Sequence, residues 1–301
     1  MARYLVTGGT GFIGKVLVGQ LVGAGHELIV ITRHPEKHSG TLNDSVRYVG
    51  KFSDIGSSTI FDAVINLGGE GIGDKRWNDK RKQVLRQSRI GLTEHLLALL
   101  ERLETRPEVM ISGSAIGWYG AHDASPLTED SPYKPEFTHD ICEEWEQAAS
   151  AVTTLGIRLC VIRLGIVLGK NGGALKKMLP PFYFGLGGRI GSGKQIMSWV
   201  HINDVIKAIN FLVNDGSHEG VFNLTAPGAV NNAQFAQAIG KTISRPTILP
   251  LPGFVVKAIF GEMGESLLLN GQNVVPQRLL DKGFSFDFPG LDAALEEILI
   301  R

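Results

Sequence analysis

Three glycines near the N-terminus have the spacing of a nucleotide-binding loop. Residues 7–14 read Thr-Gly-Gly-Thr-Gly-Phe-Ile-Gly, so Gly9, Gly11 and Gly14 fit the pattern G-x-G-x-x-G. In such a loop the first glycine allows a tight turn and the second lets backbone N–H groups approach a pyrophosphate. The third lets the next helix pack closely, with its positive end toward the phosphates. Without context, an ordinary glycine-rich turn fits equally well.

The flanking residues supply that context. An apolar run at residues 4–6 precedes the glycines, and apolar residues at helical spacing follow them as far as Gly25. Residues 27–32 then predict a second strand. The order strand, glycine turn, helix and strand predicts a dinucleotide site. Its loop residues would be Gly8, Gly9, Thr10, Gly11, Phe12, Ile13 and Gly14.

Arg33 indicates which dinucleotide is bound. An acidic residue at the end of the second strand would accept hydrogen bonds from a ribose 2′-hydroxyl, whereas a guanidinium would bind a 2′-phosphate. The chain has Thr32-Arg33-His34 there and no acid. We therefore expect NADP as the cofactor in preference to NAD. The alternative is that Arg33 is an ordinary solvated surface residue.

Composition narrows the classes of partner. The 301 residues are 43% hydrophobic and 20% charged, with a formal net charge of zero. This balance argues against nucleic-acid and membrane partners and leaves a small-molecule substrate. Apolar runs stay below the roughly 20 residues that span a bilayer, and the chain begins with a strand. Cys142 and Cys160 form no disulfide framework, so we expect a cytoplasmic protein. The sequence is compatible with a homodimer.

Alternating strands and helices predict an α/β fold, a doubly wound parallel (Rossmann) sheet with a smaller C-terminal substrate lobe. Residues 1–168 would form the NADP-binding domain, to which 201–224 return. Residues 169–200 and 225–301 would form the lobe. Within the first part, 78–104 predict one long helix and 137–155 another. In the lobe, Phe284–Phe288 is a strand-like run.

Taken together, these stretches resemble the extended short-chain dehydrogenase/reductase superfamily across nearly the whole chain. The matching pieces are the glycine loop, residues 66–70, the serine-rich end of the strand at 108–112, and residues 163–169 and 200–205. More narrowly, residues 276–284 resemble the C-terminal module of unknown function of an epimerase-like family, whose members are sometimes labelled as nucleoside-diphosphate-sugar epimerases. The resemblance implies NADP contacts at the glycine loop and at five further places besides Arg33: Thr32, Leu67, Gly68, Arg89 and Val167.

The expected catalytic pattern departs from that superfamily. Its reductases and epimerases use a serine with Tyr-x-x-x-Lys, in which the lysine lowers the tyrosine pKa for proton exchange. Anchored on Glu146, these two positions fall on Thr138 and Cys142. A threonine hydroxyl does not titrate near neutrality, and a thiol supplies no positive charge.

Ser114 is the best match to the catalytic serine, with Ser112 as the alternative. Tyr119 is the nearest phenol in sequence, although an aromatic wall of the pocket is its more ordinary role. Other candidate proton carriers are Glu70, His139, Lys194 and His201. Residues 188–194 nearly spell a phosphate-binding P-loop, but Gln195 replaces the magnesium-binding hydroxyl and no strand precedes them. The histidines and cysteines show no zinc-type grouping, so we expect no metal.

Two functions follow from this reading. The first is an NADP-dependent oxidoreductase or epimerase-like enzyme for a small hydroxyl- or carbonyl-bearing substrate, with Ser114 orienting the oxygen. That substrate would lie between the nicotinamide and a lobe that carries Met178, Phe182 and Trp199. The alternative is a non-catalytic NADP(H)-binding sensor or scaffold that has lost the tyrosine and lysine.

Overall fold

The protein is built on one parallel sheet. The structure is a computed structural model that describes residues 1–38, 45–170 and 172–300. Seven strands pair in the order β11-β7-β5-β4-β1-β2-β3, every pair parallel. Their bounds are β1 Arg3–Thr7, β2 Glu27–Ile31, β3 Val46–Val49, β4 Ala63–Asn66, β5 Val109–Ala115, β7 Arg158–Leu164 and β11 Gly220–Leu224. The predicted doubly wound parallel sheet is confirmed.

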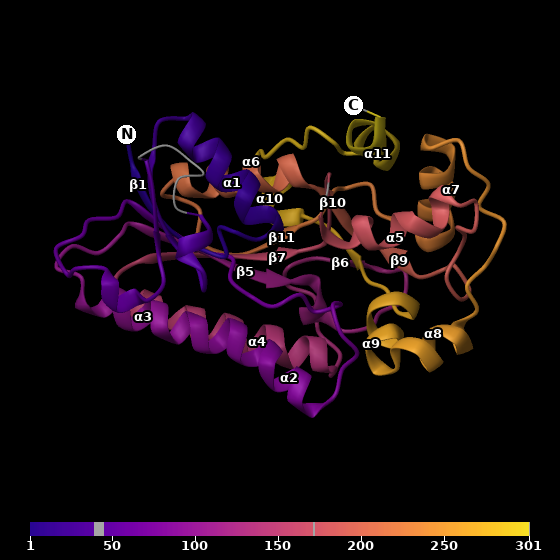
Figure 1. Ribbon diagram of the computed structural model, residues 1–301, viewed down its shortest axis with the longest axis horizontal. Helices are drawn as coiled ribbons and strands as arrows, with labels where there is room; N and C mark the ends of the chain where they lie inside the picture. The colour runs from indigo at the N-terminus through magenta and orange to yellow at the C-terminus, as the bar shows by residue number, and fades with distance from the viewer. Residues whose placement is uncertain (39–44, 171, 301) are drawn as a thin grey trace.

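Helices cover both faces of this sheet (Figure 1). One face carries α1 Phe12–Gly23, α6 Ile202–Asn214 and the short α10 Gln277–Asp281. The other carries α2 Asp79–Arg86, α3 Leu92–Arg102 and α4 Phe137–Ser150. Alternate residues of one strand enter opposite cores, because side chains alternate along a strand. Tyr4 and Val6 pack in the α1/α6 core, whereas Leu5 packs under α3 and α4.

The long helix predicted over residues 78–104 has a change of pitch. It begins at its cap Asn78, whose side chain accepts the N–H of Arg81, and it ends at Arg102. Between α2 and α3 lies a π-helical turn, Gln87–Gly91. Such turns recur at functional sites. Here the turn holds Ser88 and Arg89, and both side chains hydrogen-bond the loop after β4.

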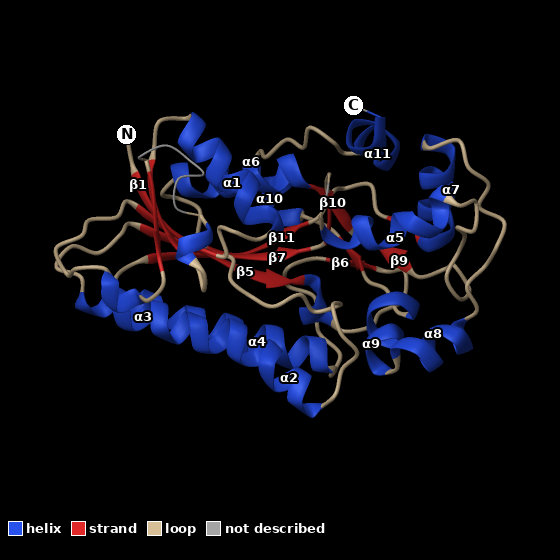
Figure 2. Cartoon of the chain, in the orientation of Figure 1, coloured by secondary structure: helices blue, strands red, loops and turns tan. Residues whose placement is uncertain are grey.

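The remaining elements form a lobe beside the sheet (Figure 2). Its helices are α5 Gly173–Tyr183, α7 Asn232–Thr242, α8 Gly253–Phe260, α9 Glu262–Gly264 and α11 Leu291–Ile300. Three two-stranded ribbons join it: β8 Ile166–Leu168 with β10 Trp199–His201, β9 Ile196–Met197 with β12 Val230–Asn231, and β6 Pro126–Leu127 with β13 Asn273–Val274. After β10 the chain returns through α6 to β11 in the main sheet.

The strand-like run Phe284–Phe288 is not a strand, so that prediction is wrong. Its residues form no helix or strand and pair with no strand among the described residues. Instead, the N–H groups of Asp287 and Phe288 donate to the two carboxylate oxygens of buried Asp204, at 2.7 and 3.0 Å. Phe284 enters the α1/α6 core. The alternating pattern therefore reflects one-sided packing against α6 rather than sheet pairing.

Candidate functional site

The glycine loop lies where the strand order reverses. β1 pairs with β2 on one side and with β4 on the other, so the connections run in opposite directions from this point. In open α/β sheets, ligands bind outside the carboxyl ends of the strands at such a switch point. The loop after β1, Arg33 after β2 and the loop after β4 all follow carboxyl ends here.

The loop backbone leaves no room for side chains. Gly8 has φ +70°, and a Cβ there would lie 2.5 Å from the carbonyl oxygen of Leu67. A Cβ on Gly14 would lie 2.1 Å from the carbonyl oxygen of Gly8. The left-handed residue of the turn is thus Gly8, not Gly9 as the motif predicts, while Gly9 makes room for Val30. Gly14 has the close-packing role expected of it.

The first turn of α1 is open to an anion. Its N-cap is Gly11, no side chain caps the helix, and its first turn holds no acidic residue. The first N–H groups of a helix lack partners inside the helix, and its dipole favours negative charge there. The donors and the side-chain-free backbone fit a dinucleotide diphosphate. Phe12 lies across the loop from Gly172, where an added Cβ would meet its ring at 2.0 Å.

A buried polar network fixes the loop after β4. The Thr7 hydroxyl donates to Oδ1 of Asn66 at 2.7 Å and accepts the N–H of Gly68 at 3.1 Å. The Asn66 amide donates in turn to the hydroxyls of Thr93 and Ser112. These contacts hold Leu67 and Gly68 beside the glycine loop, at the position that the resemblance assigns to the cofactor.

Arg33 is held by a carboxylate from that same loop. Its Nη1 donates to Oε1 of Glu70 at 2.7 Å, and Nη1 of Arg81 approaches Oε2 at 3.5 Å. Arg33 is 85% exposed, whereas Arg81 is buried and also donates to the carbonyl of Gly71. The hydrogen bond from Arg33 is the main cause that lowers the pKa of Glu70. Thr32, half-buried, precedes this pair.

Arg89 hydrogen-bonds the backbone of the loop after β4. Its Nη2 donates to the carbonyl of Glu70 at 2.9 Å and its Nη1 to the carbonyl of Leu85 at 3.2 Å. Burial lowers its pKa from the ordinary value. A cofactor contact by Arg89 remains a prediction. Val167, in β8, lies close to Gly173, near the Phe12 ring.

Ser114 lies at the end of β5 in a second polar cluster. Its hydroxyl donates to Oε1 of Glu146, on α4, at 2.6 Å. Both Glu146 oxygens also accept from Arg163, on the neighbouring strand β7, at 2.9 and 2.8 Å. Ser114 is itself buried, with 2% of the residue exposed, and its hydroxyl also interacts with the Cys142 thiol. Glu146 also borders a cavity of about 460 Å³ between α4 and the edge strand β11.

Tyr119 is fully buried rather than open to a substrate. Its hydroxyl donates to Oδ1 of Asn223 at 2.7 Å and accepts from Nη1 of Arg163 at 3.2 Å. Burial raises its pKa above the ordinary tyrosine value. This arrangement favours the structural role of an aromatic wall over proton transfer at neutral pH.

The residues at the expected tyrosine and lysine positions lie near Ser114 on α4. Thr138 and Cys142 are both buried, and Thr138 donates to the carboxylate of Glu136. Burial, and next the charge of Glu146, raise the pKa of the Cys142 thiol to about 11. Cys142 is therefore a neutral thiol at physiological pH.

Three other candidate proton carriers lie elsewhere. His201 caps α6 and contacts Glu297 at 2.9 Å, and His139 stacks on the ring of Tyr133. Lys194 is exposed in a lobe loop. Of the predicted lobe residues, Phe182 and Trp199 are buried in the lobe core, with Met178 packed against it. Within the described ranges no group of three or more His, Cys, Asp or Glu could hold a metal ion.

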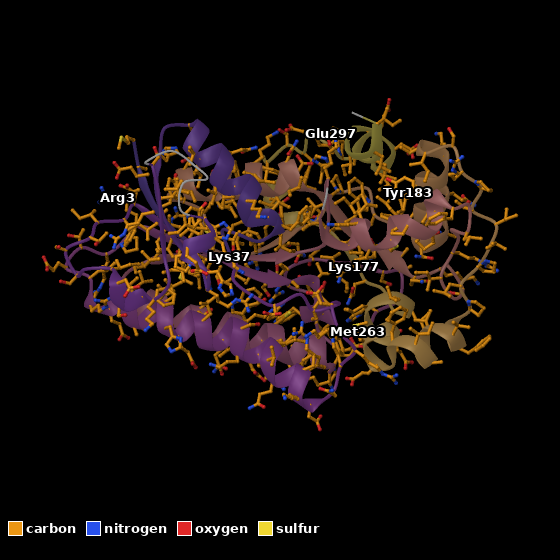
Figure 3. All side chains as sticks on the ribbon, in the orientation of Figure 1. Arg3, Lys37, Lys177, Tyr183, Met263 and Glu297 are labelled. Carbon is orange, nitrogen blue, oxygen red and sulfur yellow. The ribbon has the colours of Figure 1, made fainter. Side chains whose placement is uncertain are left out.

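The loop after β4 also joins the two parts of the molecule. Lys177, on α5, donates to the carbonyl of Gly73 at 3.0 Å and pairs with Asp74. Lys82, on α2, pairs with Glu262 at 2.7 Å. Figure 3 labels Lys177 and Met263, which come from two separate segments of the lobe. Met263 packs with Trp77 in a shared apolar cluster. The lobe therefore contacts the loop that carries Glu70.

Comparison with known proteins defines the class. The model of the NAD dependent epimerase/dehydratase family matches residues 4–225, and a domain of unknown function, DUF1731, matches residues 251–298. The chain therefore belongs to the NAD-dependent epimerase/dehydratase family, and it carries this C-terminal domain. Both parts of the predicted resemblance are confirmed.

Particular relatives extend across the whole chain. Mouse epimerase family protein SDR39U1 is 38% identical over 301 residues, covering 99% of each chain. The chloroplastic homologue from Arabidopsis thaliana is 36% identical over 98% of this chain and 86% of its own. The crystal structure of human SDR39U1 (isoform 2) with NADPH matches with a TM-score of 0.88 and 35% identity over 98% of both chains. A UDP-galactose 4-epimerase, 19% identical over 98% of this chain and 97% of its own with a TM-score of 0.75, shares the fold.

Two features of the site escaped the sequence analysis. Glu70 was singled out as a proton carrier, but its partner Arg33 lies 37 residues away. Glu146 served only to align the catalytic positions, although it binds both Ser114 and Arg163. The one available signal was the acid within the glycine-rich turn after β4.

In the described part of the chain no helix has the length and apolar character needed to cross a membrane.

Proposed function

We propose that the protein binds NADP across the glycine loop, with the diphosphate at the N-terminus of α1 and the 2′-phosphate at Arg33. The observation that carries this proposal is the uncapped, acid-free first turn of α1 beside a close-packed glycine cradle, in which a Cβ on Gly8 or Gly14 would clash with a backbone carbonyl. The NADPH in the human SDR39U1 structure supports it. Thr32, Leu67, Gly68, Arg89 and Val167 would border the cofactor. Residues 1–168 and 201–224 would form its domain. Residues 169–200 and 225–301 would form the substrate lobe, except that Leu279 and Phe284 pack in the core of the main sheet.

On this cofactor the protein would act as an oxidoreductase or epimerase-like enzyme for a small hydroxyl, carbonyl or sugar-nucleotide-like substrate. Bound NADP supplies hydride transfer to or from carbon. The chain's own contribution is Ser114, whose proton is directed to Glu146 at 2.6 Å. Its oxygen would accept a hydrogen bond from a substrate hydroxyl and so orient the carbon that carries it. The lobe, whose Met263 packs in one apolar cluster with Cys142, would exclude water from the space around Ser114.

The test is a turnover assay with NADPH and NADP against a panel of carbonyl compounds, alcohols and sugar nucleotides. We expect cofactor oxidation or reduction with at least one compound, and a loss of at least about tenfold in Ser114→Ala. Ser217→Ala is the control, since Ser217 is exposed in the loop before β11, at the amino end of that strand. Tight NADPH binding with no turnover across the panel would contradict the enzymatic proposal.

One observation favours a second function, a non-catalytic NADP(H) sensor or scaffold. The titratable phenol and thiol nearest Ser114, Tyr119 and Cys142, are buried, and burial raises the pKa of both. In a sensor, NADPH would instead change lobe closure through the contact of Lys177 with the loop at Gly73. Hydrogen exchange would then show NADPH-dependent protection of residues 70–77. Ser114→Ala would leave this protection unchanged.

A further inference from the structure

One end of the lobe exposes large apolar side chains. These are Tyr183 (51% exposed), Phe184 (80%), Leu186 (60%), Ile248 (80%), Leu249 (46%) and Phe254 (76%). We call this set the apolar edge. Single exposed apolar residues are ordinary, but contiguous ones mark contact sites.

The apolar edge is continuous in space although two separate segments supply it. The N–H of Leu251 donates to the carbonyl of Arg189 at 2.9 Å, and the N–H of Gly191 donates back to Leu251 at 2.8 Å. Farther along, Nε of Arg245 donates to the carbonyl of Tyr183 at 3.2 Å. Residues 183–191 and 245–251 therefore run side by side, and α8 with Phe254 follows directly. Figure 1 shows these segments beyond α5 and α7, at the end of the lobe.

The two segments that form this edge carry basic side chains and no acidic ones, and the nearest acids in sequence, Glu262 and Glu265, follow α8. The sequence holds no aspartate or glutamate at residues 147–203 or 220–261. The same ranges supply exposed cations, of which Arg189 and Arg245 stand within the two paired segments themselves. Lys257 follows Phe254 by one helical turn on α8 and is paired with Glu265. The whole chain has zero net charge, but residues 147–203 and 220–261 carry basic side chains and no acidic ones.

We propose that the apolar edge docks on an anionic lipid surface, with its aromatic and aliphatic side chains in the interface and Arg189 and Arg245 at the headgroups. Aromatic and aliphatic side chains with interspersed cations are the pattern of interfacial membrane binding, and the two paired segments carry this pattern. A symmetric second copy is the poorer occupant. It would bring Arg189 and Arg245 against themselves or each other with no acid to compensate them.

The test is co-sedimentation of the full chain with phosphatidylcholine vesicles, with and without phosphatidylglycerol. We expect binding only to the phosphatidylglycerol vesicles, weakened by salt because exposed charges are screened. Phe184→Ser with Ile248→Ser should reduce partitioning about tenfold or more. Arg189→Glu with Arg245→Glu should reduce it similarly. Ile60→Ser is the matched control, because Ile60 is 53% exposed and lies in the loop before β4, outside the lobe.

NADPH binding reports that each variant is folded, since none of these residues lies at the glycine loop. Absence of wild-type binding to phosphatidylglycerol vesicles would overturn the proposal, as would an equal loss in Ile60→Ser. Self-association in light scattering that disappears in Phe184→Ser with Ile248→Ser would assign the edge to a second copy instead. Failure of either kind leaves the proposed NADP site untouched, because that site is tested by cofactor titration.

Discussion

The Arg33 guanidinium, our proposed 2′-phosphate ligand, donates to the Glu70 carboxylate at 2.7 Å. A phosphate that binds Arg33 must therefore compete with this carboxylate. Replacing Glu70 by glutamine keeps the shape and removes the competing charge. We expect Glu70→Gln to tighten NADPH about fivefold and to leave NADH nearly unchanged, because an exposed pair is worth up to about 1 kcal/mol. Fluorescence titration with both cofactors measures the ratio.

The control for Glu70→Gln is Glu27→Gln, since Glu27 pairs with Arg3 at the amino ends of the strands. The pKa of Glu70 is lowered in the folded protein, so its pairing energy is present above the ordinary carboxyl pKa and is lost as pH falls through the lowered value. The advantage of Glu70→Gln should therefore persist unchanged between about pH 6 and 8. An unchanged NADPH to NADH ratio would count against the competition.

Gly14 and Gly19 lie in the same helix, but alanine substitutions at the two positions should change the unfolding free energy in opposite directions. A Cβ at Gly14 would lie 2.1 Å from the Gly8 carbonyl oxygen, whereas one at Gly19 meets nothing within 4 Å. Gly14→Ala should cost about 1–3 kcal/mol of unfolding free energy and weaken both NADPH and NADH. Gly19→Ala should stabilise the protein by up to about 1 kcal/mol through helix propensity. Urea unfolding measures the stability of both variants, and equal effects would contradict the close packing described at Gly14.

Glu146 and Glu144 form a second matched pair on α4. The side chains of Glu146 and Arg163 are only 13% and 4% exposed, whereas those of Glu144 and Arg86 are 42% and 37% exposed. Glu146→Gln leaves a buried guanidinium without its counter-charge and should lower the unfolding free energy by about 3 kcal/mol. Glu144→Gln should cost less than about 1 kcal/mol. A Glu146→Gln protein as stable as the wild type would show that the cluster is not structural.

The two thiols should be inert in the folded protein. Burial raises the pKa of Cys142 and of Cys160 to about 11, and only the thiolate reacts. The thiolate fraction therefore stays small at neutral pH and grows only as the pH approaches that value. We expect almost no reaction with a disulfide reagent near pH 8, and two equivalents after unfolding in urea. Fast reaction of either thiol in the native state would contradict the described packing.

Local patterns predicted the parts of the fold that local chemistry determines. The glycine turn and the apolar strands of the main sheet each depend on a few neighbouring residues, and the structure contains them. Long-range partners were beyond reach, as Ser114 and Glu146 are 32 residues apart and meet only because β5 packs on α4. The prediction of a strand at Phe284–Phe288 was wrong because its partners also lie far away in the sequence. The alternation of this run reflects packing against α6, and Asp204 on that helix, more than 80 residues earlier, accepts the N–H groups of Asp287 and Phe288 that a strand would have used.

The central claim is that α1 and Arg33 together select a phosphorylated dinucleotide. Calorimetric titration of the wild type and Arg33→Ala with NADPH and NADH tests it directly. We predict that the wild type binds NADPH at least about tenfold more tightly than NADH, since hydrogen bonds to charged groups contribute about 1.5–3 kcal/mol. Arg33→Ala should lose that preference while its NADH affinity stays the same. Absence of binding heat with either cofactor, or a wild-type preference for NADH, would contradict the claim.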